Sequence, residues 1–168
     1  GYDSILRQKG IETVVFNPLQ PRLNTFLNYR DHRKICVIDG NVGFTGGVNL
    51  ADEYINYVEL HGYWKDTGIM LKGRGVQGLT DLFLQLWQFS TGKTLDSSRY
   101  TAIHSYPCDG LVQPFGDDPM NRGNPSKTAY MQLIQQASDF VYIASPYLIL
   151  DDEMCSCLQT AALSGVDV

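Results

Sequence analysis

The sequence predicts an α/β fold, and three observations lead to this prediction. Apolar residues recur at helical spacing over 77–89. Two strand-like segments, 32–38 and 42–45, flank the turn dipeptide Asp39-Gly40, which is a strong hairpin signal. Strand-like and helix-like segments then alternate along the 168 residues, of which 43% are hydrophobic and 18% charged. This composition and alternation are typical of a layered α/β domain with a sizeable core.

The N-terminal elements are predicted from their boundaries. Residues 5–9 are expected to be the end of a helix that is capped by Gly10. A strand at 11–16 is expected to follow, and after a proline-containing loop the apolar and aromatic segment 23–29 has no clear state.

The middle of the chain continues from the predicted hairpin. A short helical stretch is expected at 50–55, a strand at 64–72 and a well-buried helix at 77–89. Residues 90–124 are rich in turn formers, and only 110–115 has a strand-like pattern.

Three elements are expected in the last part of the chain: a helix at 125–137, a buried strand at 140–144, and a helix that opens with the acidic residues 151–153. Gly165 is expected to cap this last helix, and residues 166–168 resemble the opening of a strand. Because the chain then stops, we expect it to be a piece of a longer protein.

Charge and cysteine spacing narrow the function classes. The net charge of −5 argues against a surface built to hold nucleic acid. No apolar stretch approaches the ~20 residues that a membrane-spanning helix needs, and no signal peptide is visible. The four cysteines have no disulfide-framework or metal-ligand spacing, so free thiols and no metal are expected at Cys36, Cys108, Cys155 and Cys157.

One pattern carries chemistry, and a chance match to it is on the order of 10⁻⁵ at average residue usage. It reads His32-x-Lys34, then Asp39 after four residues, then Gly46-Gly47-x-Asn49 after six more.

The residue types in this pattern suit a phosphodiester. Residues two apart on a strand point to the same face, so His32 and Lys34 place an imidazole beside an ammonium. The backbone N–H groups of Gly46 and Gly47 and the amide of Asn49 can donate to phosphate oxygens. Asn49 also suits a simple turn-forming role.

Such a site can work without a metal ion. A neutral imidazole attacks phosphorus and forms a phosphohistidine, while Lys34 and Asn49 stabilise the charge on the equatorial oxygens. The imidazole needs a carboxylate at its other nitrogen, and the leaving alkoxide needs a proton from a second acid. The chain supplies no clear candidate for this second acid.

These residues resemble the HKD motif of the phospholipase D superfamily. The surrounding segments 28–34 and 44–54 are similar to those of bacterial cardiolipin synthases. Residues 64–67, 145–147 and 161–168 are also similar to that family, so the resemblance covers most of the chain.

The resemblance implies a fold and an activity. It implies a phospholipase D-like α/β/α sandwich, with one half nearly complete at 1–95, a connecting segment at 96–124 and the start of a second half at 125–168. It also implies a transferase of phospholipid biosynthesis that converts two phosphatidylglycerol molecules into cardiolipin and glycerol. No cofactor is implied. The parent protein is expected at the bacterial cell membrane, held by segments that this chain lacks, and the chain itself is expected to be soluble.

The resemblance also implies roles for individual residues. Asp66 matches the acidic residue that orients the nucleophilic imidazole, although an acid with only a local partner stays an alternative. Asp39 belongs to the catalytic motif and is expected to stabilise the hairpin turn. Gly68 stands where the family more often has His.

The superfamily uses a second motif, and here neither His61 nor His104 is followed by Lys two residues later. The expected partner is therefore the missing half or a second copy of the chain, and the chain alone is expected to be inactive.

Two other functions stay open. One is a different phosphodiesterase or nuclease of the same superfamily. The other is a dinucleotide-binding module, because Gly73-x-Gly75-x-x-Gly78 follows a predicted strand and opens a predicted helix. Tyr147, beside Pro146, suits either a lipid head-group site or ordinary packing.

Overall fold

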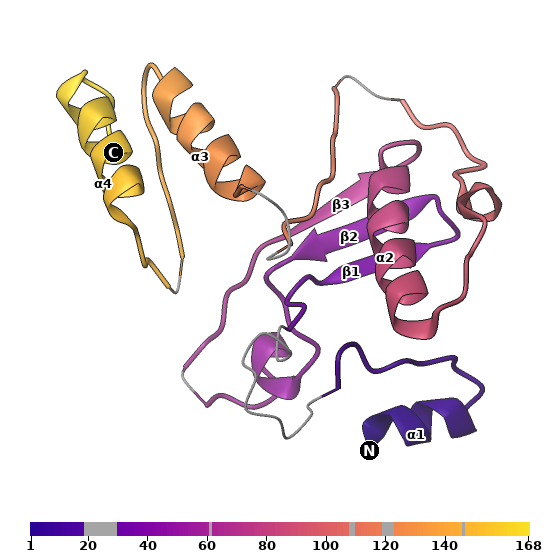
Figure 1. Cartoon of the computed structure of the whole chain (residues 1–168). Helices are drawn as coiled ribbons and strands as arrows, with labels where there is room; N and C mark the ends of the chain where they lie inside the picture. The colour runs from indigo at the N-terminus through magenta and orange to yellow at the C-terminus, as the bar shows by residue number, and fades with distance from the viewer. Residues whose placement is uncertain (19–29, 61, 108–109, 119–122, 146) are drawn as a thin grey trace. The chain divides into compact units, whose positions relative to one another are not determined.

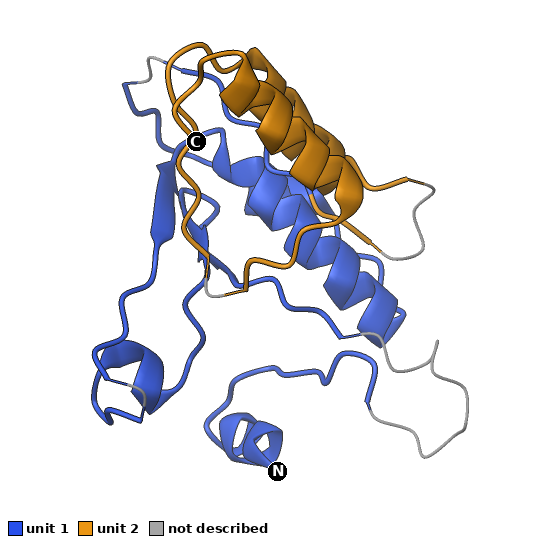
Figure 2. Cartoon of the chain, turned by 90° about the vertical axis from the view of Figure 1, so that its left-hand side faces the viewer, with its two compact units in different colours: residues 1–115 blue, residues 116–168 orange. Residues whose placement is uncertain are grey.

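The computed structural model divides into two compact units. The structure describes residues 1–18, 30–60, 62–107, 110–118, 123–145 and 147–168. Unit 1 covers residues 1–115 and unit 2 covers residues 116–168 (Figure 2). The boundary lies inside the predicted connecting segment, and the assignment of the units to two halves of a larger catalytic domain stays a prediction.

Unit 1 is built on a three-stranded antiparallel sheet in the order β1-β2-β3 (Figure 1). The strands are β1 (Ile35–Ile38), β2 (Val42–Gly46) and β3 (Gly68–Lys72). A mixed α/β fold is therefore confirmed, whereas the phospholipase D-like sandwich stays a prediction. Two strands start later than expected, because residues 32–34 precede β1 and residues 64–67 precede β3.

The turn between β1 and β2 has the backbone that the sequence predicts. Asp39 and Gly40 have φ angles of 53° and 65°, as both central residues of a type I′ turn require. The Asn41 N–H donates to the Ile38 carbonyl oxygen at 3.0 Å and closes the turn.

Helix α2 (Val76–Thr91) covers one face of the sheet (Figure 1) and confirms the predicted helix at 77–89. Its buried positions, Val76, Leu79, Thr80 and Leu84, lie on one stripe of the helix. A Cβ atom at Gly43 would stand 2.9 Å from Leu79 Cδ1 and 3.2 Å from Val76 Cγ1. The absent side chain of Gly43 therefore lets the helix approach β2 closely.

The opposite face of the sheet is apolar and exposed. Ile38, Phe44 and Met70 expose 49%, 41% and 53% of their surface, and Cys36 beside them is exposed as well. The register pairs Cys36 with Phe44 and Phe44 with Met70, so these side chains share one face.

Asn41 connects the hairpin to the segment that follows α2. Its side chain is 4% exposed and donates to the Asp39 carbonyl oxygen at 2.7 Å. Its Oδ1 accepts from the backbone N–H groups of Ile103 and His104, each at 2.9 Å. One buried amide thus holds three backbone groups, which would otherwise need water or another partner.

The described residues of unit 2 form two helices, α3 (Pro125–Gln136) and α4 (Asp152–Leu163), and both confirm the sequence prediction. Asn124 caps α3 and Asp151 caps α4, each through a side-chain oxygen that accepts a backbone N–H. The buried cluster of the unit comprises Ile134, Cys157, Ala161 and Val166.

The N-terminal ends of α3 and α4 are joined by Lys127. Its ammonium lies 2.6 Å from Asp151 Oδ2 and also pairs closely with Glu153. These hydrogen bonds, first to Asp151 and then to Glu153, raise the pKa of Lys127. The bond from Lys127 lowers the pKa of Asp151, with a smaller contribution from the Met154 N–H.

Three predicted strands do not form in the described residues. Residues 11–16 and 110–115 have no ladder, and residues 140–144 make only a single parallel bridge, between Phe140 and Asp167. The prediction that 140–144 is buried is also wrong, because Phe140 and Tyr142 are 61% and 71% exposed. Local sequence favours extended backbone, but a strand needs a neighbour, and none of the described residues pairs with these segments along their length.

The remaining described elements are α1 (Tyr2–Gln8), η2 (Asp52–Ile55) and η3 (Ser97–Tyr100). The first two agree with the predicted helical segments at 5–9 and 50–55. The segment 23–29, together with Cys108, His61 and Pro146, lies outside the described residues.

The cysteines Cys36, Cys155 and Cys157 carry free thiols. In the described ranges, no group of three His, Cys, Asp or Glu side chains is arranged to hold a metal ion. Among those same residues, no helix combines the length and the apolar character that crossing a membrane requires.

Replacement of Asn41 by Ala should destabilise unit 1 by about 1–3 kcal/mol, because the N–H groups of Ile103 and His104 lose their acceptor in a partly buried place. Urea unfolding of the chain, followed by tryptophan fluorescence, measures the change. The exposed residue Gln88 provides the control, and Gln88→Ala should leave the midpoint unchanged. Equal midpoints for Asn41→Ala and Gln88→Ala would contradict this account of the hairpin.

Replacement of Lys127 by Met should weaken the pH dependence of the stability of α4. The lowered pKa of Asp151 contributes stability above its ordinary value of 3.8, and this contribution is lost as the pH falls through the lowered value. Amide hydrogen exchange in α4 at pH 7 and pH 3 should differ less in Lys127→Met than in the unaltered chain. Lys9→Met, at an exposed position in unit 1, should not change this difference.

Candidate functional site

The antiparallel register brings the predicted site segments to one end of the sheet. Ile35 pairs with Thr45, and Gly46 pairs with Gly68, so β1 begins where β2 ends and β3 begins. The segments 30–34, 47–49 and 62–67 therefore all meet the sheet at this end (Figure 1). They carry every predicted site residue except Asp39 and Gly46, and Gly46 is the last residue of β2.

His32 and Lys34 lie in the segment before β1. The His32 side chain is exposed, and the Lys34 ammonium donates to the His32 carbonyl oxygen at 2.6 Å. This bond holds the ammonium next to the backbone of the predicted nucleophile. Their common face was predicted from a strand, whereas the structure places both residues outside the ladder.

The Gly46-Gly47 pair is required by close packing. A Cβ atom at Gly46 would stand 2.4 Å from the Thr67 carbonyl oxygen and 2.7 Å from Gly68 Cα. A Cβ atom at Gly47 would stand 2.3 Å from Asp66 Oδ1. The Gly47 N–H also donates to the Thr67 carbonyl oxygen at 3.1 Å. These contacts give the two glycines a structural role that their sequence pattern does not indicate.

Asp66 is the predicted site residue with the most fixed side chain. Its Oδ1 accepts from the Thr67 N–H at 2.7 Å, and its Oδ2 accepts from the indole Nε1–H of Trp64 at 3.2 Å. Together with the close approach of Gly47, these bonds fix the carboxylate beside the end of β2. The local partners that the sequence left open for Asp66 are therefore Thr67 and Trp64.

The structure brings the side chains that are predicted to bind phosphate only partly together. Asn49 is half-buried and lies two residues beyond Gly47. Within the described ranges, no hydrogen bond or ion pair joins the His32 imidazole to Asn49 or Asp66. The convergence of these side chains on one phosphate therefore stays a prediction.

Asp39 lies apart from the other site residues. It occupies the β1-β2 turn, at the end of the hairpin opposite to His32, and its carbonyl oxygen accepts from the Asn41 side chain at 2.7 Å. This position suits the expected role in the turn and separates Asp39 from any phosphate bound near His32.

The glycine run between β3 and α2 is also explained by packing. Gly73 has a φ of 82° and donates its N–H to the Asn41 carbonyl oxygen at 2.8 Å. A Cβ atom at Gly78 would stand 2.9 Å from Pro114 Cδ. A dinucleotide-binding unit has parallel strands, whereas β3 is antiparallel to β2. Neighbouring protein atoms thus account for these glycines without a bound dinucleotide.

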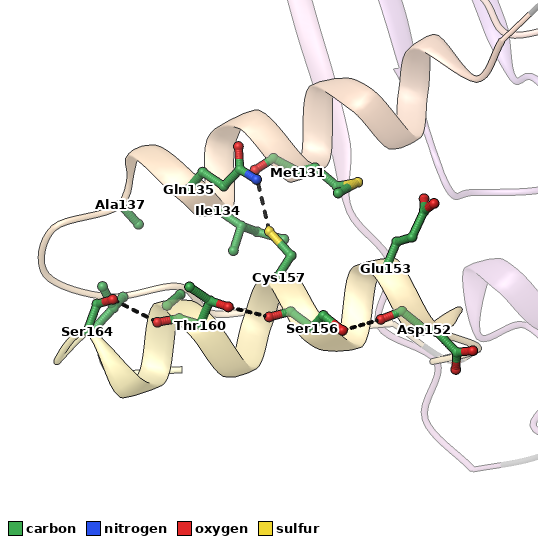
Figure 3. Close-up of a pocket in the computed structure, with 12 residues that line it drawn as sticks. Met131, Ile134, Gln135, Ala137, Asp152, Glu153, Ser156, Cys157, Thr160 and Ser164 are labelled. Atoms are coloured by element: carbon green, nitrogen blue, oxygen red, sulfur yellow. Dashed lines mark hydrogen bonds between the residues drawn. The ribbon is translucent and has the colours of Figure 1, made fainter.

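A pocket of about 520 Å³ in unit 2 lies between α3 and α4 (Figure 3). Ser156, Thr160 and Ser164 line it, and each hydroxyl donates to the carbonyl oxygen four residues earlier. None of the predicted site residues lines this pocket. The hydroxyls are satisfied by their own helix, which is an ordinary role for Ser and Thr on a helix.

Two further residues that the sequence singled out, His104 and Tyr147, are exposed. The imidazole of His104 is exposed on the segment after η3, and only its backbone N–H contacts Asn41. Tyr147 is 78% exposed in unit 2.

Comparison with known proteins gives a consistent set of relatives. The chain is 42% identical over 99% of its length to a cardiolipin synthase of Alkalihalophilus pseudofirmus and 41% identical to cardiolipin synthase 2 of Bacillus cereus. It is 48% identical to an uncharacterized protein of Streptococcus mutans. The chain spans about a third of the length of each of these relatives. No family model matches the chain, and no solved structure matches it. The chain is thus related to cardiolipin synthases over nearly its whole length.

Replacement of Gly46 by Ala should destabilise unit 1 by about 1–3 kcal/mol or more, because the new methyl group meets backbone atoms of Thr67 and Gly68 that cannot move independently. The paired residue Gly68 offers a matched control, since a Cβ atom there would stand 3.7 Å from the nearest atom, the Thr45 carbonyl oxygen. Urea midpoints should therefore fall in Gly46→Ala and change little in Gly68→Ala. A midpoint for Gly46→Ala equal to that of Gly68→Ala would show that this register is wrong.

Proposed function

We propose that the protein carrying this chain transfers phosphatidyl groups between phosphatidylglycerol molecules and so makes cardiolipin. The observation that carries the proposal is the identity of about 40% to cardiolipin synthases over 99% of the chain. The common location of His32, Gly47 and Asp66 at one end of the sheet supports it.

The proposed reaction has two displacements at phosphorus. An imidazole nitrogen of His32 attacks the phosphorus of one phosphatidylglycerol, and the bond between phosphorus and the head-group glycerol oxygen breaks. That oxygen takes a proton and leaves as glycerol. A glycerol hydroxyl of a second phosphatidylglycerol then loses its proton and attacks the phosphohistidine, and the P–N bond breaks. Cardiolipin is released, and the imidazole returns to its starting state.

Electrostatic stabilisation is supplied by the chain itself in this proposal. The Lys34 ammonium, the Asn49 amide and the Gly46 N–H donate to the equatorial oxygens as negative charge accumulates, whereas the Gly47 N–H stays bonded to the Thr67 carbonyl oxygen. Lys34 already lies beside the His32 backbone, at 2.6 Å from its carbonyl oxygen. No metal ion has a step in this scheme.

Asp66 supports the nucleophile in the same proposal. Its carboxylate accepts the N–H of the imidazole nitrogen that does not attack, and so it fixes the tautomer and favours the positive charge that develops on His32. Asp39 holds the β1-β2 turn and has no direct part in the chemistry.

The acid that protonates the departing glycerol is proposed to lie outside the described site. It belongs either to a second motif in the remainder of a longer chain or to a second copy of this chain. The substrate is a bilayer lipid, so the site is proposed to work at the membrane surface.

Replacement of His32 by Asn should abolish transfer in the intact protein, with kcat reduced at least about a thousandfold, because the phosphorus loses its nucleophile. Incubation with ³²P-labelled phosphatidylglycerol should give an acid-labile protein adduct that the His32→Asn variant lacks. His104→Asn removes an exposed imidazole far along the chain and should keep both activity and adduct. Normal turnover by His32→Asn would refute the assignment of the nucleophile.

A further inference from the structure

We infer that Trp64 is a positioning residue, whose indole N–H fixes the Asp66 carboxylate for the His32 imidazole, and that Asn56 holds Trp64 in place for this purpose. The inference rests on the proposed function, because it gives Asp66 the task of orienting the nucleophile. It goes beyond that proposal by assigning a positioning role to two residues that do not react with the substrate.

The Asp66 carboxylate is held at both oxygens. Trp64 Nε1–H donates to Oδ2 at 3.2 Å, and the Thr67 N–H donates to Oδ1 at 2.7 Å. Rotation of the carboxylate would break at least one of these bonds. An ionised carboxylate has about four acceptor positions, so two bonds leave capacity for the N–H of an imidazole.

The backbone of Gly47 packs against the Asp66 carboxylate. A Cβ atom at this position would come within 2.3 Å of Asp66 Oδ1 and within 3.1 Å of its Cγ. The carboxylate is therefore packed against the backbone that follows β2. This packing places Asp66 next to the segment that carries Asn49.

Trp64 is itself fixed by the short helix η2. Asn56 donates from Nδ2 to the Trp64 carbonyl oxygen at 2.8 Å and accepts the Trp64 N–H on Oδ1 at 2.6 Å. The Tyr54 ring meets the indole edge-on, with centroids 5.1 Å apart and planes at 80°. Asn56 has a φ of 58°, a left-handed conformation that Asn adopts more readily than most residues.

The type of donor suits an orienting role. A Lys or Arg at this place would also hold the carboxylate, but it would neutralise the charge that must face the imidazolium. The indole N–H is a neutral donor, so it orients Asp66 and leaves the full negative charge for His32. Catalysis depends on such orientation, since a displacement of about 1 Å can reduce a rate about a hundredfold.

Trp64→Phe in the intact protein tests the inference, because it keeps an aromatic ring against Tyr54 and removes only the indole donor. We expect kcat for phosphatidyl transfer to fall about tenfold to a hundredfold with KM unchanged, since Trp64 is proposed to act through Asp66 and not on the lipid. Asn56→Gly, which tolerates the left-handed backbone, should reduce kcat in the same way. The control is Trp87→Phe in α2, where the ring stacks on Phe83 and kcat should not change.

A second measurement follows the contact directly. The ¹H–¹⁵N signal of the Trp64 indole should lie at a different position in Asp66→Asn than in the unaltered protein, because the indole N–H loses its carboxylate acceptor, while the signal of the Trp87 indole stays unaffected. This readout does not depend on the activity of the protein.

The outcomes separate the inference from the proposed function. If the unaltered protein transfers phosphatidyl groups and both Trp64→Phe and Asn56→Gly keep full kcat, the positioning role is wrong and the proposed function stands. If kcat and KM both change as in a globally destabilised protein, or if the Trp64 indole signal ignores Asp66, the inference is overturned. If the unaltered protein makes no cardiolipin, the proposed function fails and the positioning role fails with it.

Discussion

The antiparallel register of three short strands is the constraint on which the candidate site depends. The pairing of Ile35 with Thr45 and of Gly46 with Gly68 places three separate segments at one end of the sheet. A slip of one residue would turn every side chain to the opposite face. The register is set by the Asp39-Gly40 turn at the far end, which Asn41 ties to the chain after α2. Elements far from the candidate site thus decide whether its segments come together.

At the near end of the sheet, the same residues serve packing and the proposed chemistry. Gly46 and Gly47 let β2 and the start of β3 approach closely, and this approach brings Asp66 next to the predicted phosphate-binding segment. At Gly47 the packing role takes the backbone donor, because its N–H donates to the Thr67 carbonyl oxygen at 3.1 Å. Substitutions at these residues are therefore expected to change both the stability of unit 1 and the proposed activity.

The sequence predicted those elements whose signals are local. The helix at 76–91 follows from its apolar spacing, the helix at 152–163 follows from the acidic residues 151–153 at its start, and the hairpin follows from its turn residues. Strands at 11–16 and 140–144 were not found as ladders, because pairing depends on a partner that local sequence does not encode. The pattern from His32 to Asn49 was visible as spacing, whereas the bonds from Asn56 through Trp64 to Asp66 were not. Those bonds join residues across a loop, and no periodic pattern in the sequence indicates them.

A crystal structure of the intact protein with bound orthovanadate tests the central claim most directly, because vanadate imitates phosphorus under attack. The account predicts that an imidazole nitrogen of His32 lies within bonding reach of vanadium, that Lys34 and Asn49 donate to its oxygens, and that Asp66 accepts the other imidazole N–H. Vanadate bound elsewhere, or these side chains directed into separate regions, would contradict the account.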